Sequence, residues 1–334
     1  MLSPGISVVA HRHPAWTRAP SAFHARWVPL FLFAVWGCAP APQSASPEPS
    51  PTPSTPPTVG LLIMAHGGNE AWNHSVEAAV AEAARRMPTA LAFGMADPHT
   101  LRAGVESLEA QGVERAVVVR LFLSGASFRE QTEWLLGMSE VRPRHLMIMR
   151  HDPPAGDASH APAEVEPIEH SLELVTHDHG LLDTRLAARI MTERATDLSR
   201  ARAGESVLLL AHGMGDDAEN AAVLANLERI AEAIRAAGFA RVRAATLRED
   251  WPGKREAAQA EVRAFVDREA AASRTVLVLP ARLSGFGPYA EVLEGLEYTP
   301  GDGLLPHPAL ADWIVRTGTR VACESGWLSS EACG

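Results

Sequence analysis

The chain has 334 residues, of which 46% are hydrophobic and 21% are charged, and its formal net charge is −10 at pH 7. This composition is ordinary for a folded globular protein, and the length allows two domains of about 130 residues, each able to bury a core. The negative charge argues against nucleic acid and an anionic membrane surface as partners, although local arginines can still form a pocket for an acidic ligand.

Residues 1–38 predict a lipoprotein-type signal peptide. A short apolar run ends at Trp36, and Gly37 comes directly before Cys38. The run is too short to span a bilayer, and a small residue before a cysteine resembles the bacterial lipoprotein cleavage site. Residues 39–58 are rich enough in proline to form an extended tether. We therefore expect an exported lipoprotein of the cell envelope, facing the periplasm and anchored only through lipid on Cys38; the alternative is a disordered N-terminus with a chance cysteine.

The next part of the chain alternates strands and helices. A continuous apolar run ends in His66-Gly67, as expected of a buried parallel strand that leads into a turn. Gly112 follows the second helix, at the position where helices commonly end. The expected elements are strands at 61–65, 91–95 and 116–123 and helices at 75–86 and 99–111.

The second half repeats the first. Residues 59–68, VGLLIMAHGG, return as SVLLLAHGMG, and VVVRLFLSG returns as LVLPARLSG. A third pair, HGLL at 179–182 and HPAL at 307–310, follows in the same order. The repetition indicates two half-chains of similar architecture. The second set of expected elements comprises strands at 208–211, 242–247 and 276–279 and helices at 220–237 and 257–271.

These patterns predict an α/β protein of two similar domains, each a parallel β-sheet flanked by helices, facing each other across a cleft. Ligands of parallel sheets bind at the carboxyl ends of the strands, so the chemistry is expected there. The helix within 177–200 is a candidate to pack on the first domain. The expected divisions are a first domain at 59–150, a His- and acid-rich connecting loop at 151–176, a second domain at 177–322 and a tail at 323–334.

Missing motifs exclude two common enzyme classes. An α/β hydrolase needs G-x-S-x-G, and Ser124 and Ser284 precede glycines but lack the leading glycine. The chain has no Walker lysine motif and no G-x-G-x-x-G after a strand. We therefore expect no bound nucleotide.

A fixed series of short motifs carries a resemblance to a known family. The series is strand-Ala-His-Gly, an asparagine at 73 or 220, a strand ending near Asp-Pro, V-V-V-x-L-F-L-S-G and a late H-P-x-L, over about residues 59–322. It resembles the sirohydrochlorin chelatases, the class II chelatases of cobalamin and siroheme synthesis (the CbiX/SirB type), in a duplicated two-domain form. The resemblance implies that a tetrapyrrole binds between two α/β domains and that a divalent metal, Co²⁺ or Fe²⁺, is inserted into it without ATP.

The resemblance assigns roles to two histidines. His66 matches the family's first metal-binding histidine, and His212 occupies the same place in the second half. Imidazole suits metal insertion because it binds late divalent transition metals and is largely neutral at pH 7, so it can also accept pyrrole protons. We predict catalytic and metal-binding roles for both. The alternative for each is a histidine that only caps its turn.

The family's second histidine is missing from both halves. Three explanations stay open: His66 and His212 cooperate, a carboxylate supplies the missing ligand, or catalysis has been lost. The vacant positions fall at Ser127 or Phe128 and at Gly287 or Pro288. The candidate carboxylates are Glu70, Asp97, Glu249, Asp250 and Glu291, of which Glu291 is included in the predicted metal site.

An acidic tetrapyrrole predicts basic groups at the ends of the third strands. Arg120 and Arg282 stand at those ends, and arginine binds carboxylates bidentately. An interdomain salt bridge is the alternative for these arginines. The predicted substrate-binding residues are Arg120, Ser124, Gly125, Arg282, Ser284 and Gly285.

Two other segments carry metal-binding or redox-active residue types. Residues 151–170 are rich in His, Asp and Glu and could gather metal, although ordinary loop composition explains them equally well. In the tail, Cys323 and Cys333 can close a disulfide loop in an exported chain. A zinc pair is the alternative, but no further cysteine completes such a site.

Two functions therefore stay open. One is a chelatase, a lyase, with a divalent metal and a tetrapyrrole as its partners. The other is a non-catalytic envelope lipoprotein that binds metal or tetrapyrrole without turnover. The family resemblance favours the first function, which is the one we predict. The missing histidine and the export signal favour the second, because tetrapyrrole synthesis is normally cytosolic.

Overall fold

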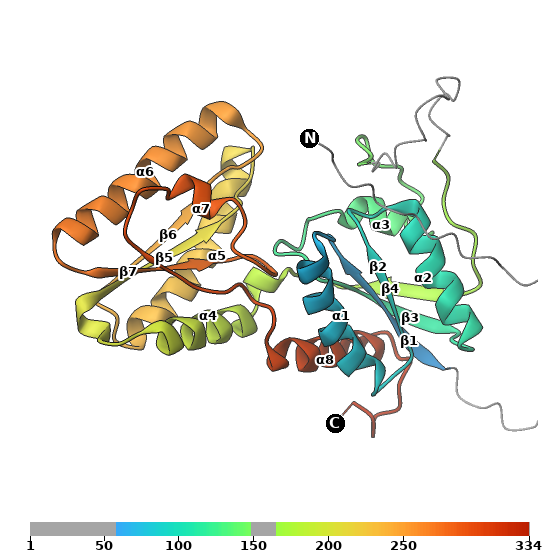
Figure 1. Cartoon of the computed structure of the whole chain (residues 1–334). Coiled ribbons are helices and arrows are strands. Elements are labelled where there is room, and N and C mark those ends of the chain that lie inside the picture. The colour runs from blue at the N-terminus through green and yellow to red at the C-terminus, as the bar shows by residue number, and fades with distance from the viewer. Residues whose placement is uncertain (1–57, 148–164, 334) are drawn as a thin grey trace, which may run out of the picture. The chain divides into compact units, whose positions relative to one another are not determined.

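The computed structural model describes residues 58–147 and 165–333. They form two four-stranded sheets in which every strand pair is parallel (Figure 1). The first sheet, in the order β2-β1-β3-β4, contains β1 (Val59–Ala65), β2 (Thr89–Phe93), β3 (Arg115–Arg120) and β4 (Glu173–Thr176). The second, in the order β6-β5-β7-β8, contains β5 (Glu205–Ala211), β6 (Arg241–Thr246), β7 (Thr275–Pro280) and β8 (Thr299–Pro300).

Helices flank both sheets, and the predicted α/β fold class is confirmed. Each strand and helix expected from the sequence is present, whereas the expected elements did not include β4, β8, α3, α7 or α8. The facing of the two domains across a cleft stays a prediction. The helices are α1 (Glu70–Ala84), α2 (Pro98–Ala110), α3 (Arg129–Leu135), α4 (Arg185–Leu198), α5 (Asp217–Ala236), α6 (Pro252–Ala271), α7 (Tyr289–Val292) and α8 (Pro308–Glu324), with short 3₁₀ turns at Leu181–Asp183 and Arg202–Gly204.

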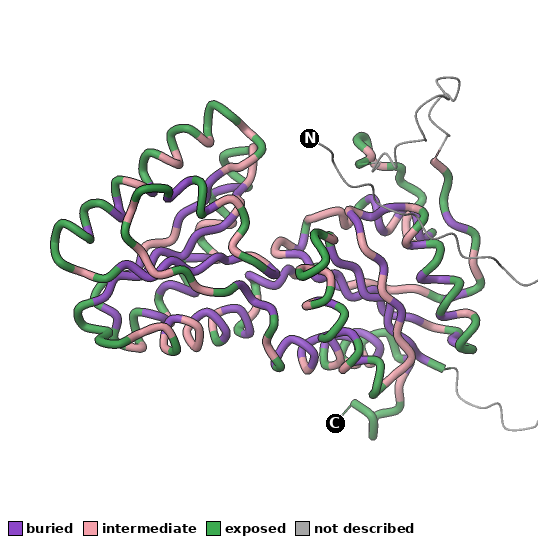
Figure 2. The backbone as a smooth tube through the Cα atoms, in the orientation of Figure 1, coloured by how far each residue is buried: buried purple, intermediate pink, exposed green. Residues whose placement is uncertain are grey.

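The repeat in the sequence is a repeat in the structure. All seven residues of β1 and all seven of β5 are buried, as their unbroken apolar runs predict for the inner strands of a parallel sheet (Figure 2). The pairing is equivalent in the two sheets, since Ala65 lies opposite Phe93 and Ala211 opposite Thr246. The histidines that follow Ala65 and Ala211 therefore leave equivalent strands at equivalent heights.

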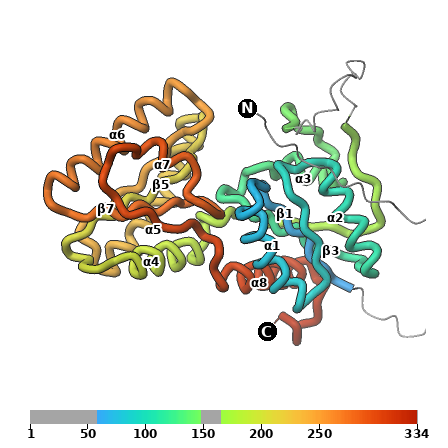
Figure 3. Tube along the Cα trace, in the orientation of Figure 1, coloured from blue at the N-terminus to red at the C-terminus, as the bar shows by residue number. Residues whose placement is uncertain are grey.

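The two halves exchange helices. Helix α4 follows the last strand of the first sheet but packs against α5 and β7 of the second. Helix α8 follows the second sheet but packs against α1 and β3 of the first (Figure 3). The expectation that the helix within 177–200 packs on the first domain is therefore wrong, because it is α8 that covers that sheet. The expected connecting loop also includes β4, which belongs to the first sheet.

Close packing of helices on β1 depends on two glycines. A Cβ atom added to Gly318 of α8 would lie 2.3 Å from Leu61 Cδ2, and one added to Gly104 of α2 would lie 2.6 Å from Leu62 Cδ1. Successive residues of a strand point to opposite faces, so the two glycines bring helices against opposite faces of β1. Any larger side chain at either position requires the leucine side chain or the helix to move.

We expect Gly318→Val to lower the free energy of unfolding by about 1–3 kcal/mol, the usual cost of overpacking a core. The matched control is Gly253→Ala in α6, where an added Cβ has no atom within 4 Å. Alanine there should leave stability unchanged or raise it by up to about 1 kcal/mol through helix propensity. Urea unfolding followed by circular dichroism measures both, and equal stability of the valine variant and the wild type would contradict the packing argument.

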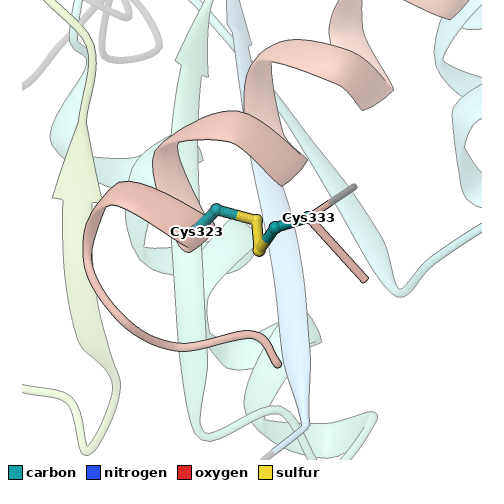
Figure 4. Close-up of a disulfide and its surroundings, with 2 residues drawn as sticks. All are labelled: Cys323 and Cys333. Atoms are coloured by element: carbon teal, nitrogen blue, oxygen red, sulfur yellow. A yellow bond between two sulfur atoms is a disulfide. The ribbon is translucent and has the colours of Figure 1, made fainter. Parts of the chain in front are cut away.

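A disulfide joins Cys323, near the end of α8, to Cys333 in the tail, with Cα atoms 5.9 Å apart (Figure 4). The structure thus contains the covalent loop that the cysteine spacing predicts, and it secures the chain that follows α8.

Several sequence-based predictions lie outside the described residues. These are the signal peptide, the lipidation of Cys38, nearly all of the tether and most of the stretch at 151–170. Across the described part of the chain, none of the helices has the length and apolar character needed to cross a membrane.

Candidate functional site

Each half presents a histidine in a turn directly after its central strand. His66 is exposed, and its Nδ1 lies 2.8 Å from the carbonyl oxygen of Gly67. His212 is partly exposed, and its Nδ1 lies 2.8 Å from the carbonyl oxygen of Gly213. The two glycines have φ of +84° and +82°, in the left-handed region that other residues rarely adopt. Glycine is therefore what allows the chain to turn so sharply after each histidine.

An asparagine on the following helix anchors each turn. Asn73 Oδ1 accepts a hydrogen bond from the backbone N–H of Gly68 at 2.8 Å, and Asn220 Oδ1 accepts one from Met214 N–H at 3.0 Å. These are the asparagines that the sequence motif places seven or eight residues after the histidines. Their role in this structure is to hold the turns that carry the histidines.

The Nδ1 contacts determine what the imidazoles can do. A carbonyl oxygen only accepts, so Nδ1 of both His66 and His212 must carry a proton and donate it. In the neutral ring, Nε2 then keeps its lone pair. Each turn therefore presents an Nε2 atom that can bind a divalent metal or accept a proton at the carboxyl end of a parallel sheet.

The second half adds a carboxylate to its histidine. Asp250 Oδ2 lies 3.1 Å from His212 Nε2, and the ring of Trp251 stands edge-on to the imidazole with centroids 6.0 Å apart. Because Nδ1 already donates to a carbonyl, both ring nitrogens of His212 face oxygen atoms. The Asp250 contact is attractive only when a proton or another cation sits on Nε2. The pair is thus arranged to hold a positive charge between imidazole and carboxylate.

The first half uses the corresponding aspartate differently. Asp97 is buried and caps α2, because its Oδ1 accepts from the N–H groups of His99 and Thr100 at 3.0 Å. The segment between the edge strand and the helix-starting proline is one residue longer in the second half. That residue allows Trp251 to precede the helix, and Asp250 turns to His212 instead of capping α6.

Among the described residues, Glu70, Glu249 and Glu291 form no ion pair with His66 or His212. Glu70 is exposed in the first turn of α1, and Glu291 is exposed in the short α7. Glu249 is paired with Arg282, whose Nη1 lies 2.9 Å from Glu249 Oε1. Of the five predicted carboxylates, Asp250 is the one found beside a predicted histidine.

The Ser-Gly turns after β3 and β7 differ. An added Cβ at Gly125 would lie 2.0 Å from the carbonyl oxygen of Asp178, so this glycine is needed for close contact between two chain segments. Ser124 Oγ accepts from Ala126 N–H at 3.3 Å. In the second half, Ser284 is buried while Gly285 is exposed with φ of +73°. Gly285 is therefore the more accessible member of this predicted set.

Arg120 is not placed to bind substrate. Its side chain is buried, with the residue 1% exposed, and the guanidinium donates to the carbonyl oxygens of His177 and Ser127 at 2.5 and 3.1 Å. Burial, and then the nearby Arg129, lower the pKa of Arg120 to about 10, which still leaves it charged at neutral pH. The expected carboxylate-binding role is wrong for this conformation, and Arg120 instead ties the end of β3 to the chain after β4. The sequence could not show the burial of Arg120, because an arginine at the end of a strand gives the same sequence pattern whether its side chain points inwards or outwards.

Buried His177 completes that connection, which sequence analysis did not find. Its Nε2 accepts from the Arg120 backbone N–H at 3.0 Å and its Nδ1 donates to the carbonyl oxygen of His179 at 2.9 Å. Both ring nitrogens of His177 have hydrogen-bond partners in the neutral ring. Protonation of Nε2 would place its new N–H against the Arg120 backbone N–H, and that hydrogen bond would be lost. Burial, together with the nearby His179 and Arg120, lowers the pKa of His177 to about 3.

Solved structures share this architecture. SirB from Bacillus subtilis with Fe³⁺ has a TM-score of 0.56 at 13% identity, over 80% of this chain and 97% of that one. The sirohydrochlorin chelatase SirB from Bacillus subtilis subspecies spizizenii, in complex with cobalt, has a TM-score of 0.52 at 12% identity with the same coverage. A multi-domain protein of Deinococcus radiodurans with structural similarity to chelatases has 0.50 at 18% identity, over 78% of this chain and 55% of that one.

This chain has a chelatase-like fold. The sequence matches no protein-family model and no curated protein. The likeness is therefore one of structure, at identities that establish the fold alone.

At the positions expected for the family's second histidine, this chain has residues with roles in the backbone conformation. Ser127 supplies a carbonyl to Arg120, and Phe128 adopts a φ of +55° before α3. Gly287 has a φ of +67° and lies against the guanidinium of Arg282. Among residues 58–147 and 165–333, no three His, Cys, Asp or Glu side chains form a group that could hold a metal. The predicted set of His66, His212 and Glu291 is thus not assembled.

We expect His177→Gln to flatten the pH dependence of stability. A histidine with a folded pKa of about 3 and an unfolded pKa near 6.5 stabilises the fold fully above pH 6.5 and progressively less as the pH falls towards 3. Between pH 7 and 5 the loss is roughly 2 kcal/mol. Glutamine can still accept and donate but takes up no proton. Urea unfolding of both proteins at several pH values measures the difference, and parallel pH profiles would contradict a neutral buried His177.

Proposed function

We propose that this protein inserts a divalent metal, Co²⁺ or Fe²⁺, into a sirohydrochlorin-type tetrapyrrole without ATP. The observation that carries the proposal is the repeated strand–His–Gly turn, which presents Nε2 of His66 and of His212 at the carboxyl ends of equivalent strands. The chelatase-like fold supports it, because the similar SirB structures include complexes with Fe³⁺ and with cobalt.

The two halves contribute unequally to this chemistry. Metal insertion needs a ligand that holds the metal beside the macrocycle and a base that accepts two pyrrole protons. His66 is exposed and free of ion pairs among the described residues, which suits it to bind the incoming metal through Nε2. His212 has Asp250 at 3.1 Å, and a carboxylate there stabilises the charge that imidazole acquires with a proton or a metal. We therefore assign proton acceptance to the His212–Asp250 pair.

Recognition of an acidic tetrapyrrole is proposed for the second half. Arg282 is partly exposed, and although Glu249 pairs with it at 2.9 Å, an arginine at a surface can exchange one carboxylate for another. Gly285 is exposed nearby in the chain, and Ser284 precedes it. Ser124 is partly exposed at the corresponding place in the first half, beside buried Gly125.

We also propose that the protein is exported to the cell envelope and held there by lipid on Cys38. The order of apolar run, Gly37-Cys38 and proline-rich tether supports this proposal. The disulfide between Cys323 and Cys333 agrees with it, because such bonds persist in oxidising compartments.

A second candidate function is a metal- or tetrapyrrole-binding protein without turnover. The observation in its favour is that the positions expected for the family's second histidine, Ser127 or Phe128 and Gly287 or Pro288, hold no histidine. Such a protein would keep the fold and the turns and would bind metal or tetrapyrrole without converting them into a metallated product.

Absorbance of sirohydrochlorin with Co²⁺, without ATP, should show faster metallation with the full-length protein than without it. We expect His66→Ala and His212→Ala each to slow the reaction at least about tenfold, because general base or ligand groups contribute at least that much. Asp250→Asn should slow it about tenfold, as expected for a group that acts through a catalytic side chain. All three side chains lie at the surface, so circular dichroism should be unchanged.

The matched control is His74→Ala, which removes an exposed histidine of α1 whose side chain has no hydrogen bond or ion pair with the described residues of the turn. Its rate should equal that of the wild type. Full activity in both turn-histidine variants would contradict the proposed site. Tight binding of Co²⁺ or sirohydrochlorin with no acceleration would instead establish the second candidate function.

A further inference from the structure

The second half contains a cavity of about 450 Å³ that is separate from the predicted catalytic residues. It lies along β6, the edge strand of its sheet, and its walls come from α5 and α6. Its charged lining residues are Arg243, Arg248, Lys254 and Glu261, and Gly253 lines it as well.

The cavity is positively charged in a protein whose formal net charge is −10. Arg243, Arg248 and Lys254 line it, against a single lining carboxylate, Glu261. Arg243 pairs with Glu261 at 2.9 Å. Both other cations converge on one oxygen, because Arg248 Nη1 and Lys254 Nζ lie 2.6 and 2.7 Å from Asp217 Oδ1. Two cations share one carboxylate, which leaves a surplus of positive charge at the cavity.

The remaining walls suit a small organic molecule rather than a bare ion. Leu224, Ala257, Ala258 and Val262 form an apolar surface beside the cations. Near the mouth, Gly253 adds no side chain, and an added Cβ would have no atom within 4 Å. The first turn of α6 also contains no acidic residue and no side-chain cap that would compete with a bound anion.

The same cations hold the turn that carries His212. Arg248 donates from Nε to the carbonyl of Met214 at 2.7 Å and from Nη2 to that of Gly215 at 2.5 Å. Lys254 Nζ donates to the same Gly215 carbonyl at 2.8 Å. A ligand bound to Arg248 and Lys254 would therefore contact the same side chains that donate hydrogen bonds to the turn after His212.

We propose that this cavity binds a small organic anion through its carboxylate or phosphate groups, with Arg248 and Lys254 as the principal contacts and Arg243 as a third. An oxyanion of the ligand takes the place that Asp217 holds, while its carbon skeleton lies on the apolar wall. Guanidinium and ammonium donors are the usual protein partners of both groups. The proposal stands on the cavity and its charges and does not depend on chelatase activity.

Isothermal titration of the full-length protein with citrate, inorganic phosphate and uroporphyrin tests the proposal. We expect saturable one-to-one binding of at least one probe, weakened by added NaCl. The double variant Arg248→Gln with Lys254→Gln should raise the dissociation constant at least tenfold. Gly253→Glu should do the same while every cation remains, because it adds a carboxylate at the mouth of the cavity. Its matched control, Gly253→Gln, has the same size without the charge and should bind at least tenfold more tightly than the glutamate variant.

A second control is Arg320→Gln, which removes a cation from a different cavity, of about 270 Å³, beside α8. It should leave binding unchanged. Binding of citrate or phosphate supports a site for free anions, and binding of uroporphyrin alone supports a site for the acidic arms of a macrocycle. No binding of any probe, equal binding by Gly253→Glu and Gly253→Gln, or loss of binding in Arg320→Gln would overturn the proposal.

Discussion

The left-handed backbone at Gly67 and Gly213 is the constraint on which the proposed site depends. It reverses the chain immediately after a buried strand, so that a histidine leaves the sheet and its Nδ1 meets the carbonyl of the next residue. That single contact fixes the tautomer and points the reactive nitrogen away from the backbone. Asn73 and Asn220 complete the arrangement from the following helices, and the same solution is present in both halves.

The duplicated halves have diverged around this shared turn. One additional residue before α6 moves Asp250 away from the capping position that Asp97 occupies at α2, so that the second half pairs a carboxylate with its histidine. In the second half, Arg243, Arg248 and Lys254 also line a cavity together with one carboxylate, Glu261. The two halves therefore share a backbone fold but surround their turn histidines with different side chains.

Apolar runs, glycine positions and the internal repeat were sufficient to predict three strands of each parallel sheet, the helices that alternate with them and the turn histidines. The directions and partners of individual side chains were predicted less well, because the same sequence pattern is compatible with more than one side-chain direction. The inward turn of Arg120 depends on carbonyls after β4, a strand of four residues that carries almost no periodic signal. Asp250 could be named only as one of five acids, because its distance from His212 depends on a one-residue difference between loops. The exchange of helices could not be predicted either, because the apolar face of a helix does not indicate which of two sheets it packs against.

The exchange of α4 and α8 links the order of synthesis to the order of folding. The strands of the first sheet are made before the second sheet, but one of the helices that cover the first sheet, Pro308–Glu324, is made only after the second sheet. Until then Leu61 lacks the part of its packing surface that α8 supplies. The first half therefore cannot complete its core before the second half has been made, and a chain truncated before α8 exposes apolar surface of the first sheet that chaperones or proteases would recognise.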